Sequence, residues 1–455
     1  MENNIVSEEV SVAHFQTAEC VELASAQGLQ LPKQACQDSP QCPESPVNEY
    51  PSLMAAFRHA NTSLCTSEPM SNKLKTAVQA FAKVDPTELP AEVRTDLGHA
   101  VGAMEKAAVG DFSGVASQYQ RLVKTNLGDA TSHRIFFTIW NRLEERMQLC
   151  VLLCRINTRI LELLQISRSR PFIECLVARL GVKSYPEEIV ASRLHAVEII
   201  ASAGQRPHVL FADFLEMGPD SSIDSSTAGG LLFDSFGDLF LDYMPSVERV
   251  FPNVADWLAK RSLLNRTSIR FLTAAHVQAH DLCGHSVPFS LAHPNRLAAI
   301  PALRAHLEEL YADAQAMWIC TASQTRSFLT NVLSEQELNA IPVINAMKNL
   351  TYYAKKAASD HDARCAWVMF GYFRKSGLIR RLNNRHGELF FDIDLLPKVS
   401  NQLLDDLLDV EYSIGQGVAA YESACRQFNE RFGYENPLNR EWEIPDELGH
   451  LLLEA

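Results

Sequence analysis

The stretch AAHVQAHDLCGHSVP, residues 274–288, places three of the fourteen histidines of this 455-residue chain within ten positions. His276 and His280 are four residues apart, which puts both on one face of a helix. His280 and His285 are five apart and would diverge by about 140° in a regular α-helix. They converge only if the helix loosens between them, and Gly284 is where a one-residue π-bulge costs least. The stretch therefore predicts a helix that ends in an irregular turn.

A second helix is predicted at 306–318, HLEELYADAQAMW, where apolar residues recur as an amphipathic stripe. Glu309 and Asp313 flank this stripe one turn apart. Two imidazoles and a carboxylate from two neighbouring helices make a three-ligand zinc site with a fourth position for water. The further carboxylates, Glu308 and Asp313, would accept ring N–H groups and fix the histidine tautomers. Asp281 would be placed to accept a proton from the water.

A different ligand set needs no irregular turn. His276 and His280, with Glu309 and Asp313, would form a two-histidine, two-carboxylate site suited to Fe²⁺ or Mn²⁺. Such a site would indicate a non-haem iron oxygenase, or an HD-type hydrolase that uses the His280–Asp281 pair. A metal-binding relative without catalysis is a third alternative, and histidines on an apolar helix are often only core residues.

Two motifs resemble those of a known family, dipeptidyl peptidase III and its relatives. HDLCGH, 280–285, resembles the family's HExxGH hexapeptide, and EELYAD, 308–313, resembles its second motif, Glu-Glu-x-Arg-Ala-Glu/Asp. The segment 360–379 resembles a later helix of the family, and 387–434 its closing strand and helix pair. The resemblance spans about 270–434 and implies a zinc-dependent hydrolase that cleaves peptide or amide bonds.

The resemblance also implies roles for the matching residues. In the family, zinc is held by both histidines of the hexapeptide and the second glutamate of the later motif, which correspond here to His280, His285 and Glu309. The second residue of the hexapeptide is the general base, and Asp281 takes that position. Activated water would then be the nucleophile.

Four further positions correspond to supporting residues of the family. Glu308 and Asp313 match carboxylates that flank the zinc ligands. His361 and Arg364 are the nearest counterparts of a substrate-contacting histidine and arginine, although they lie one residue closer together.

The sequence departs from the family pattern in three places. Asp281 stands where the family has glutamate, so its carboxylate reaches one methylene less far. Leu310 and Tyr311 replace the usual x-Arg, and only 24 positions separate His285 from Glu309. These departures favour a metal site more firmly than they favour peptide cleavage.

Composition excludes several classes of function. The net charge is 41 − 55 = −14, which predicts neither a nucleic-acid nor an anionic membrane partner. No run of eighteen apolar residues and no basic, apolar signal segment occur. Eleven cysteines without a repeated spacing favour a reduced, cytoplasmic protein. No glycine-rich nucleotide motif is present, so the expected partner is a small-molecule or peptide-like substrate, and the oligomeric state is open.

The apolar pattern predicts a mainly α fold. Its parts are a mobile leader at 1–48, a multi-helix N-terminal region at 49–262, and a helical metal-binding catalytic region with a minor β element at 263–455. Helices are expected from about residue 50 and over 132–165, 185–203, 230–262, 265–284, 300–320, 340–376 and 397–432, with short strands within 208–215 and 383–397.

Overall fold

The structure of the chain is a computed structural model. It describes residues 50–123, 133–140, 147–180, 194–210, 215, 230–285, 301–382, 388–414, 426, 430–433 and 443–453. The leader predicted at 1–48 lies outside these residues, and the domain boundaries at 48 and 262 stay predictions.

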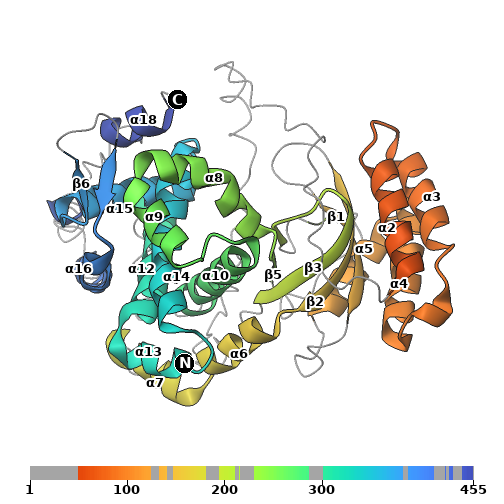
Figure 1. The fold of residues 1–455 in the computed structure, drawn as a ribbon, viewed down its shortest axis with the longest axis horizontal. Coiled ribbons are helices and arrows are strands. Elements are labelled where there is room, and N and C mark those ends of the chain that lie inside the picture. Colours follow the sequence, from red (N-terminus) through yellow and green to blue (C-terminus); the bar gives the residue numbers. More distant parts are fainter. Residues whose placement is uncertain are drawn as a thin grey trace, which may run out of the picture. The chain divides into compact units, whose positions relative to one another are not determined.

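The predicted helices after residue 50 are confirmed. They are α2 (Pro51–Leu64), α3 (Met70–Phe81), the 3₁₀ turn η2 (Pro86–Glu88), α4 (Ala91–Ala107) and α5 (Ser113–Val123). Helix α2 packs on α3 and on strand β3, and α4 and α5 pack on β1 (Figure 1).

These helices cover a five-stranded sheet with the order β1-β2-β3-β5-β4. All neighbouring strands are antiparallel except β3 and β5. The strands are β1 (Arg134–Trp140), β2 (Gln148–Ile156), β3 (Leu194–Gly204), β4 (Val209–Leu210) and β5 (Gly230–Phe233).

The sheet corrects the predicted helices at 132–165 and 185–203. Among the described residues of these two ranges, 134–140, 148–156 and 194–204 are strands, and 158–167 forms a helix (α6). The strands in 134–156 are buried almost throughout, so their apolar residues run continuously and fit a buried strand as well as a helix. The short strand predicted within 208–215 is confirmed at β4.

The remaining chain is mostly helical, and the predicted mainly α fold class is confirmed. The helices are α6 (Thr158–Ser167), α7 (Arg170–Leu180), α8 (Phe236–Val250), α9 (Pro252–Lys260), α10 (Arg266–Ala279), the π-helix η7 (His280–His285), α12 (Pro301–Thr321), α13 (Ser323–Leu329), α14 (Glu335–Thr351), the 3₁₀ turn η9 (Tyr353–Lys355), α15 (His361–Lys375), the 3₁₀ turn η10 (Ile393–Leu395), α16 (Leu396–Ile414) and α18 (Asp446–Leu453). Strands β6 (Ile379–Arg381) and β7 (Leu389–Phe391) form a separate hairpin.

The helix predicted over 340–376 is two helices rather than one. Helix α14 begins at a capping box, in which Ser334 and Glu337 satisfy each other's backbone N–H groups, and it ends at Thr351. The chain then turns through η9, and Asp360 caps the start of α15. The turn between the two helices brings the start of α15 back beside α14.

Two buried clusters divide the apolar side chains. One joins α2–α5 to the sheet, and the other gathers the helices from α6 onward. Helix α12 lies in the second cluster against α14, α15, α16 and η7 (Figure 1). Every residue in 310–320 is buried, so this half of α12 is enclosed on all sides. The amphipathic stripe predicted over 306–318 is therefore wrong from residue 310 onward. No helix in the described ranges is both long and apolar enough to span a membrane.

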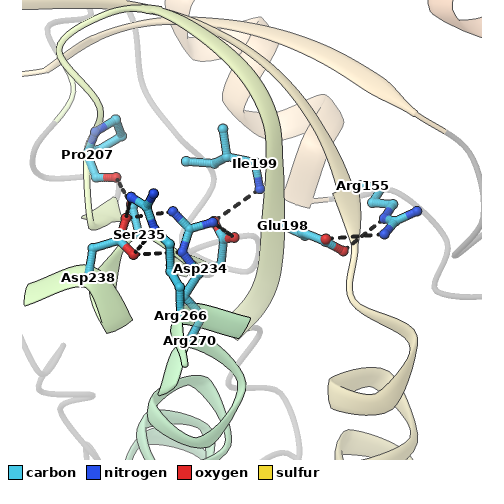
Figure 2. Close-up of polar contacts among 9 residues, drawn as sticks. All are labelled: Arg155, Glu198, Ile199, Pro207, Asp234, Ser235, Asp238, Arg266 and Arg270. Carbon is cyan, nitrogen blue, oxygen red and sulfur yellow. Dashed lines mark hydrogen bonds and ion pairs between the residues drawn. The ribbon is translucent and has the colours of Figure 1, made fainter. Parts of the chain in front are cut away.

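An ion-pair network, here called the Arg270 network, fixes the start of α10. Arg270 binds Asp234 at 2.7 Å and Asp238 at 2.6 Å, and Arg266 binds Asp238 at 2.7 Å (Figure 2). Asp234 also accepts a hydrogen bond from the backbone N–H of Ile199 in β3. Helix α10 is therefore tied both to α8 and to the sheet.

Helices α8 and α10 approach closely at this point. A Cβ built on Gly237 would lie 2.5 Å from the Cα of Arg270, a distance no side chain tolerates. Glycine at 237 therefore lets the two backbones approach, and the Arg270 network sets the register of the helix that carries His276 and leads into His280.

Candidate metal centre

Four elements converge on one carboxylate, that of Asp313 in α12. Helix α10 supplies His276, the π-helix η7 begins with His280, and the buried faces of α14 and α15 complete the surroundings. The irregular turn predicted between His280 and His285 is confirmed, since these residues form the π-helix. The wider turn of the π-helix accommodates the five-residue spacing of His280 and His285, which is one residue more than a regular helical turn allows.

His280 lies between the two carboxylates of α12. Its Nδ1 is 2.9 Å from Oδ1 of Asp313, and its Nε2 is 3.2 Å from Oε2 of Glu309. Burial alone would lower the pKa of His280, but the charges of Asp313 and Glu309 raise it well above its ordinary value. Both ring nitrogens of this histidine therefore face an acceptor.

Asp313 is the centre of a buried polar group, here called the Asp313 cluster, which consists of Asp313, His276, His280, Asn345, Asn349 and Cys365. The amide of Asn345 donates to Oδ1 at 3.2 Å, and that of Asn349 donates to Oδ2 at 2.7 Å. The Cys365 thiol lies 3.7 Å from Oδ2. Burial would raise the pKa of Asp313, but the charge of His280 and its hydrogen bond hold it well below its usual range. The carboxylate is thus ionised, buried and surrounded by donors.

His276 differs from His280 in having no hydrogen bond. Its side chain is buried, and its Nε2 lies 3.6 Å from Oδ1 of Asp313, too far for a hydrogen bond. Neither ring nitrogen has a partner within the described part of the chain. Burial and the nearby charge of Lys348 lower the pKa of His276 to about 3, so this imidazole is neutral.

The donor set fits a divalent metal through His280 and Glu309. Two ligand atoms at zinc-like bond lengths of about 2.1 Å on a tetrahedral ion lie roughly 3.4 Å apart. The 3.2 Å between His280 Nε2 and Glu309 Oε2 is close to that value. His285 ends the same π-helix, and its side chain lies outside the described residues.

A second donor group overlaps the first. Suitable atoms of His276, His280 and Asp313 all lie within 4.8 Å of one another. However, Asp313 already accepts from two amides and from His280 Nδ1. Its geometry is that of a carboxylate that orients the imidazole of His280, whose Nε2 faces Glu309.

The other predicted site residues lie around this centre. Asp281 follows His280 in η7 and is half-buried, as is Glu308 beside Glu309. His361 is exposed at the first position of α15, whereas the Arg364 Nε donates to the carbonyl of Ala358. The catalytic roles of Asp281, His361 and Arg364 stay predictions.

Sequence reasoning missed four polar residues near Glu309 and Asp313. Asn345, Lys348 and Asn349 lie at i, i+3 and i+4 of α14, and they interrupt an otherwise apolar segment, NAIPVINAMKNLT. That spacing was a usable signal, since polar residues on one face of a buried helix need buried partners. Burial and the charge of Glu309 raise the pKa of Asp362, the fourth residue, to about 6.

Comparison with known proteins supports the fold but gives no family by sequence. No model of a protein family and no curated protein matches the chain. Among solved structures, dipeptidyl peptidase III from Caldithrix abyssi matches 85% of this chain and 70% of its own, with 11% identity and a TM-score of 0.51. Dipeptidyl-peptidase III from Corallococcus sp. strain EGB matches 85% and 67%, with 10% identity and a TM-score of 0.41. The match to the first extends beyond the 270–434 segment on which the sequence resemblance depended, and the chain has a dipeptidyl peptidase III-like fold.

Proposed function

We propose that this chain is a zinc-dependent hydrolase of peptide or amide bonds, with the metal held by His280, His285 and Glu309. One observation carries the proposal: His280 Nε2 faces Glu309 Oε2 at 3.2 Å while Asp313 holds Nδ1 at 2.9 Å. This arrangement fixes the tautomer that leaves Nε2 as a ligand. The fold shared with a structure named as a peptidase supports the reaction class.

The protein residues divide the remaining work. When bound, a divalent metal lowers the pKa of water and polarises a carbonyl. Asp281, adjacent to His280, accepts the proton of the attacking water on a carboxylate oxygen and returns it to the leaving nitrogen. His361 and Arg364, at the start of α15, orient the substrate.

The side chain of Asp281 is one methylene shorter than that of glutamate, which limits its reach to the attacking water. If reach limits proton transfer, Asp281→Glu increases kcat, and Asp281→Asn reduces it by at least about 100-fold, within the usual range for general-base catalysis. Metal content measured on both variants separates an effect on proton transfer from loss of the ion. Unchanged turnover in Asp281→Asn, with metal retained, would remove Asp281 from the mechanism.

A second candidate is a site for Fe²⁺ or Mn²⁺ on His276, His280 and Asp313, with oxygenase or HD-type hydrolase chemistry. It is supported by the short distances among their donor atoms. It predicts that His276→Gln loses the metal, whereas the zinc proposal predicts that this variant keeps it.

The test is elemental analysis of protein isolated without added metal, together with hydrolysis of a mixed tripeptide library. We expect about one zinc per chain, activity abolished by chelation, and loss of both in Glu309→Gln. His276→Gln is the matched variant, since it changes a neighbouring polar residue outside the proposed ligand set. Retention of metal by Glu309→Gln and its loss in His276→Gln would replace the first proposal by the second.

A further inference from the structure

The carboxylate of Asp234 joins the five-stranded sheet to helix α10. Asp234 lies between the end of β5 and the start of α8, and its backbone N–H donates to the carbonyl of Val197 in β3 at 2.9 Å. Its side chain accepts a hydrogen bond from the N–H of Ile199 at 3.1 Å and pairs with Arg270 at 2.7 Å (Figure 2). The same carboxylate therefore contacts β3 on one side and α10 on the other.

Asp238, the other carboxylate of the Arg270 network, is held by more hydrogen bonds. Nε and Nη2 of Arg270 bind its two oxygens at 2.7 and 2.6 Å, and Nε and Nη2 of Arg266 bind them at 2.9 and 2.7 Å. Asp234 receives Nη1 of Arg270 alone among the guanidinium nitrogens of the two arginines. Two guanidinium groups thus serve Asp238, whereas Asp234 shares one of them.

The charged and titratable groups that face Asp234 come from four elements. They are Arg270 and Arg266 in α10, Asp238 in α8, Glu198 in β3, and Arg155 and Cys154 in β2. Arg155 is engaged by Glu198 at 2.8 Å, and burial keeps the Cys154 thiol protonated by raising its pKa to about 12. Arg270 is therefore the cation that offsets the charge of Asp234, and it divides its hydrogen bonds between two carboxylates.

The two carboxylates respond to this environment in opposite directions. Burial raises the pKa of Asp234 to about 6, and the charges of Asp238 and Glu198 act in the same direction, although Arg270 and the Ile199 N–H oppose them. Burial would also raise the pKa of Asp238, but the hydrogen bonds from its two arginines lower it to about 2. Between these two values Asp234 is neutral while Asp238 stays ionised.

The contact between α8 and α10 does not depend on the charge of Asp234. A Cβ built on Gly237 would lie 2.5 Å from the Cα of Arg270, so the two backbones touch there. Asp238 adds four hydrogen bonds across the same contact. The link from α10 to Ile199 of β3, by contrast, runs through the side chain of Asp234.

We propose that the Asp234–Arg270 pair is a pH-sensitive link between β3 and α10, which weakens when Asp234 is protonated while Asp238 keeps α8 fixed to α10. The proton binds a carboxylate oxygen of Asp234 and removes the negative charge that Arg270 faces. Hydrogen bonds to a charged acceptor are stronger than those to a neutral one, so the bond from the Ile199 N–H weakens as well. Arg270 retains both of its hydrogen bonds to Asp238.

This local weakening differs from acid unfolding. An aspartate of the unfolded chain titrates near 4, so the folded chain binds the proton of Asp234 at a higher pH than the unfolded chain does. The contribution of Asp234 to the free energy of unfolding therefore increases as the pH falls from about 6 to about 4. The pH window is separate from that of Asp238, whose contribution is lost below about 4.

Hydrogen exchange of the Ile199 amide tests the proposal on the full, unmodified chain. The protection factor, which removes the intrinsic pH dependence of exchange, is measured at residue resolution between pH 5 and pH 8. We expect it to fall about tenfold from pH 7.5 to pH 5, the size expected for the loss of one hydrogen bond. The midpoint should lie near pH 6, and the amides inside α10 should keep their protection. Equal protection of the Ile199 amide at both pH values would overturn the proposal.

Asp234→Asn replaces the carboxylate by a neutral group of the same shape. At pH 7.5 its Ile199 amide should show the low protection of wild type at pH 5, with no further dependence on pH. Asp96→Asn is the matched control, because it removes another enclosed carboxylate, which pairs with Arg121 and Arg134, and it should keep the wild-type pH dependence at Ile199. The same pH dependence in Asp234→Asn as in wild type would assign the titration to another group and overturn the proposal.

Urea unfolding at pH 7.5 and pH 4.5 tests the sign of the linkage. The folded wild-type chain takes up a proton at Asp234 in this range, whereas Asp234→Asn does not, so the urea midpoint of wild type should rise relative to that of the variant as the pH is lowered. A relative fall would mean that the folded chain favours the ionised carboxylate and would overturn the proposal. The exchange measurement on wild type decides the question alone if Asp234→Asn does not fold.

Discussion

The two ends of one helical stretch, α10 and the π-helix that follows it, each carry a buried polar group, and the two groups are built differently. At the start, two arginines and two aspartates of the Arg270 network pair at 2.6–2.7 Å, so the charges balance (Figure 2). At the other end, two histidines face Glu309 and Asp313, and one of the histidines has no hydrogen bond. The charges of the first group balance within it, whereas one histidine of the second has no hydrogen-bond partner among the described residues.

This difference separates a polar group with balanced charges from the proposed metal centre. In the Arg270 network, each carboxylate has a guanidinium partner, and nothing remains for a ligand to satisfy. In the Asp313 cluster, the carboxylate is satisfied by its neighbours, whereas the ring nitrogens of His276 have no hydrogen-bond partner among the described residues. Burial alone does not distinguish the two groups, because both are largely buried; the balance of donors, acceptors and charge does.

The largest effect on stability is expected at the Arg270 network. Arg270→Met leaves Asp234, whose side chain is only 12% exposed, without its cation. Removal of one partner of a buried ion pair typically costs about 3–5 kcal/mol. We expect a loss of that size in the free energy of unfolding in urea, with a smaller effect on zinc affinity in the protein that remains folded.

Arg170→Met is the matched control. Arg170 pairs with Glu174 at 2.8 Å, but the two side chains are 89% and 62% exposed. Water screens such a pair, so its loss should cost far less than the loss of Arg270. Similar losses for Arg170→Met and Arg270→Met would contradict the assignment of the buried network as the clamp on α10.

The second-largest effect is expected at the other end of the helical stretch, in the Asp313 cluster. Asp313→Asn keeps the shape of the side chain but places an amide opposite the donors of Asn345, Asn349 and His280. A change in the partner of a metal-binding histidine typically lowers metal affinity 10–100-fold. We expect zinc affinity, measured by competition with a chelator, to fall within that range. Unchanged zinc affinity in a folded variant would show that Asp313 does not orient His280.

Acid should weaken the Arg270 network. Burial alone would raise the pKa of Asp238, but hydrogen bonds from Arg270 and Arg266 lower it to about 2, below the usual value near 4. A carboxylate with a lowered pKa in the folded state stabilises the protein above its unfolded pKa, and this contribution is lost as pH falls from about 4 to 2. The shift corresponds to about 2 kcal/mol.

The measurement is the unfolding free energy of wild type and Asp238→Asn at pH 2, 3, 4 and 6. The difference between the two proteins should shrink as the pH falls from 4 towards 2. Asp256→Asn, which changes an exposed carboxylate of α9, serves as the control and should show a much smaller pH dependence. A difference that grows in acid would reverse the sign of the expected linkage.

The sequence contained more information about the candidate site than about the sheet. The spacing of His276, His280 and His285 predicted the irregular turn, because helix geometry makes a five-residue spacing incompatible with convergence unless the backbone loosens. The i, i+4 spacing of Glu309 and Asp313 placed both carboxylates along one side of α12, and His280 lies between them.

The sheet was hidden because its strands are buried on both faces. In β1 and β2 nearly every described side chain is buried, so no alternation of polar and apolar residues appears. Cys150 and Cys154 have the same four-residue spacing as His276 and His280, yet the cysteines lie in a strand. Two residues four positions apart lie on one face of a helix and also on one face of a strand, so this spacing does not distinguish the two. Only the polar residues around the histidines indicated a helix there.

The smallest effect is expected at Cys365, where the Asp313 cluster contacts α15. Burial raises the pKa of this thiol well above its ordinary value, so it stays protonated and donates weakly to Asp313 at 3.7 Å. Cys365→Ala should therefore cost about 1 kcal/mol of stability and change zinc affinity less than threefold. A tenfold loss of zinc affinity would instead make the thiol part of the set that orients His280. The two ends would then differ more clearly. The Asp313 carboxylate would depend on every donor around it. In the Arg270 network, by contrast, Asp238 still pairs with Arg266 when Arg270 is removed.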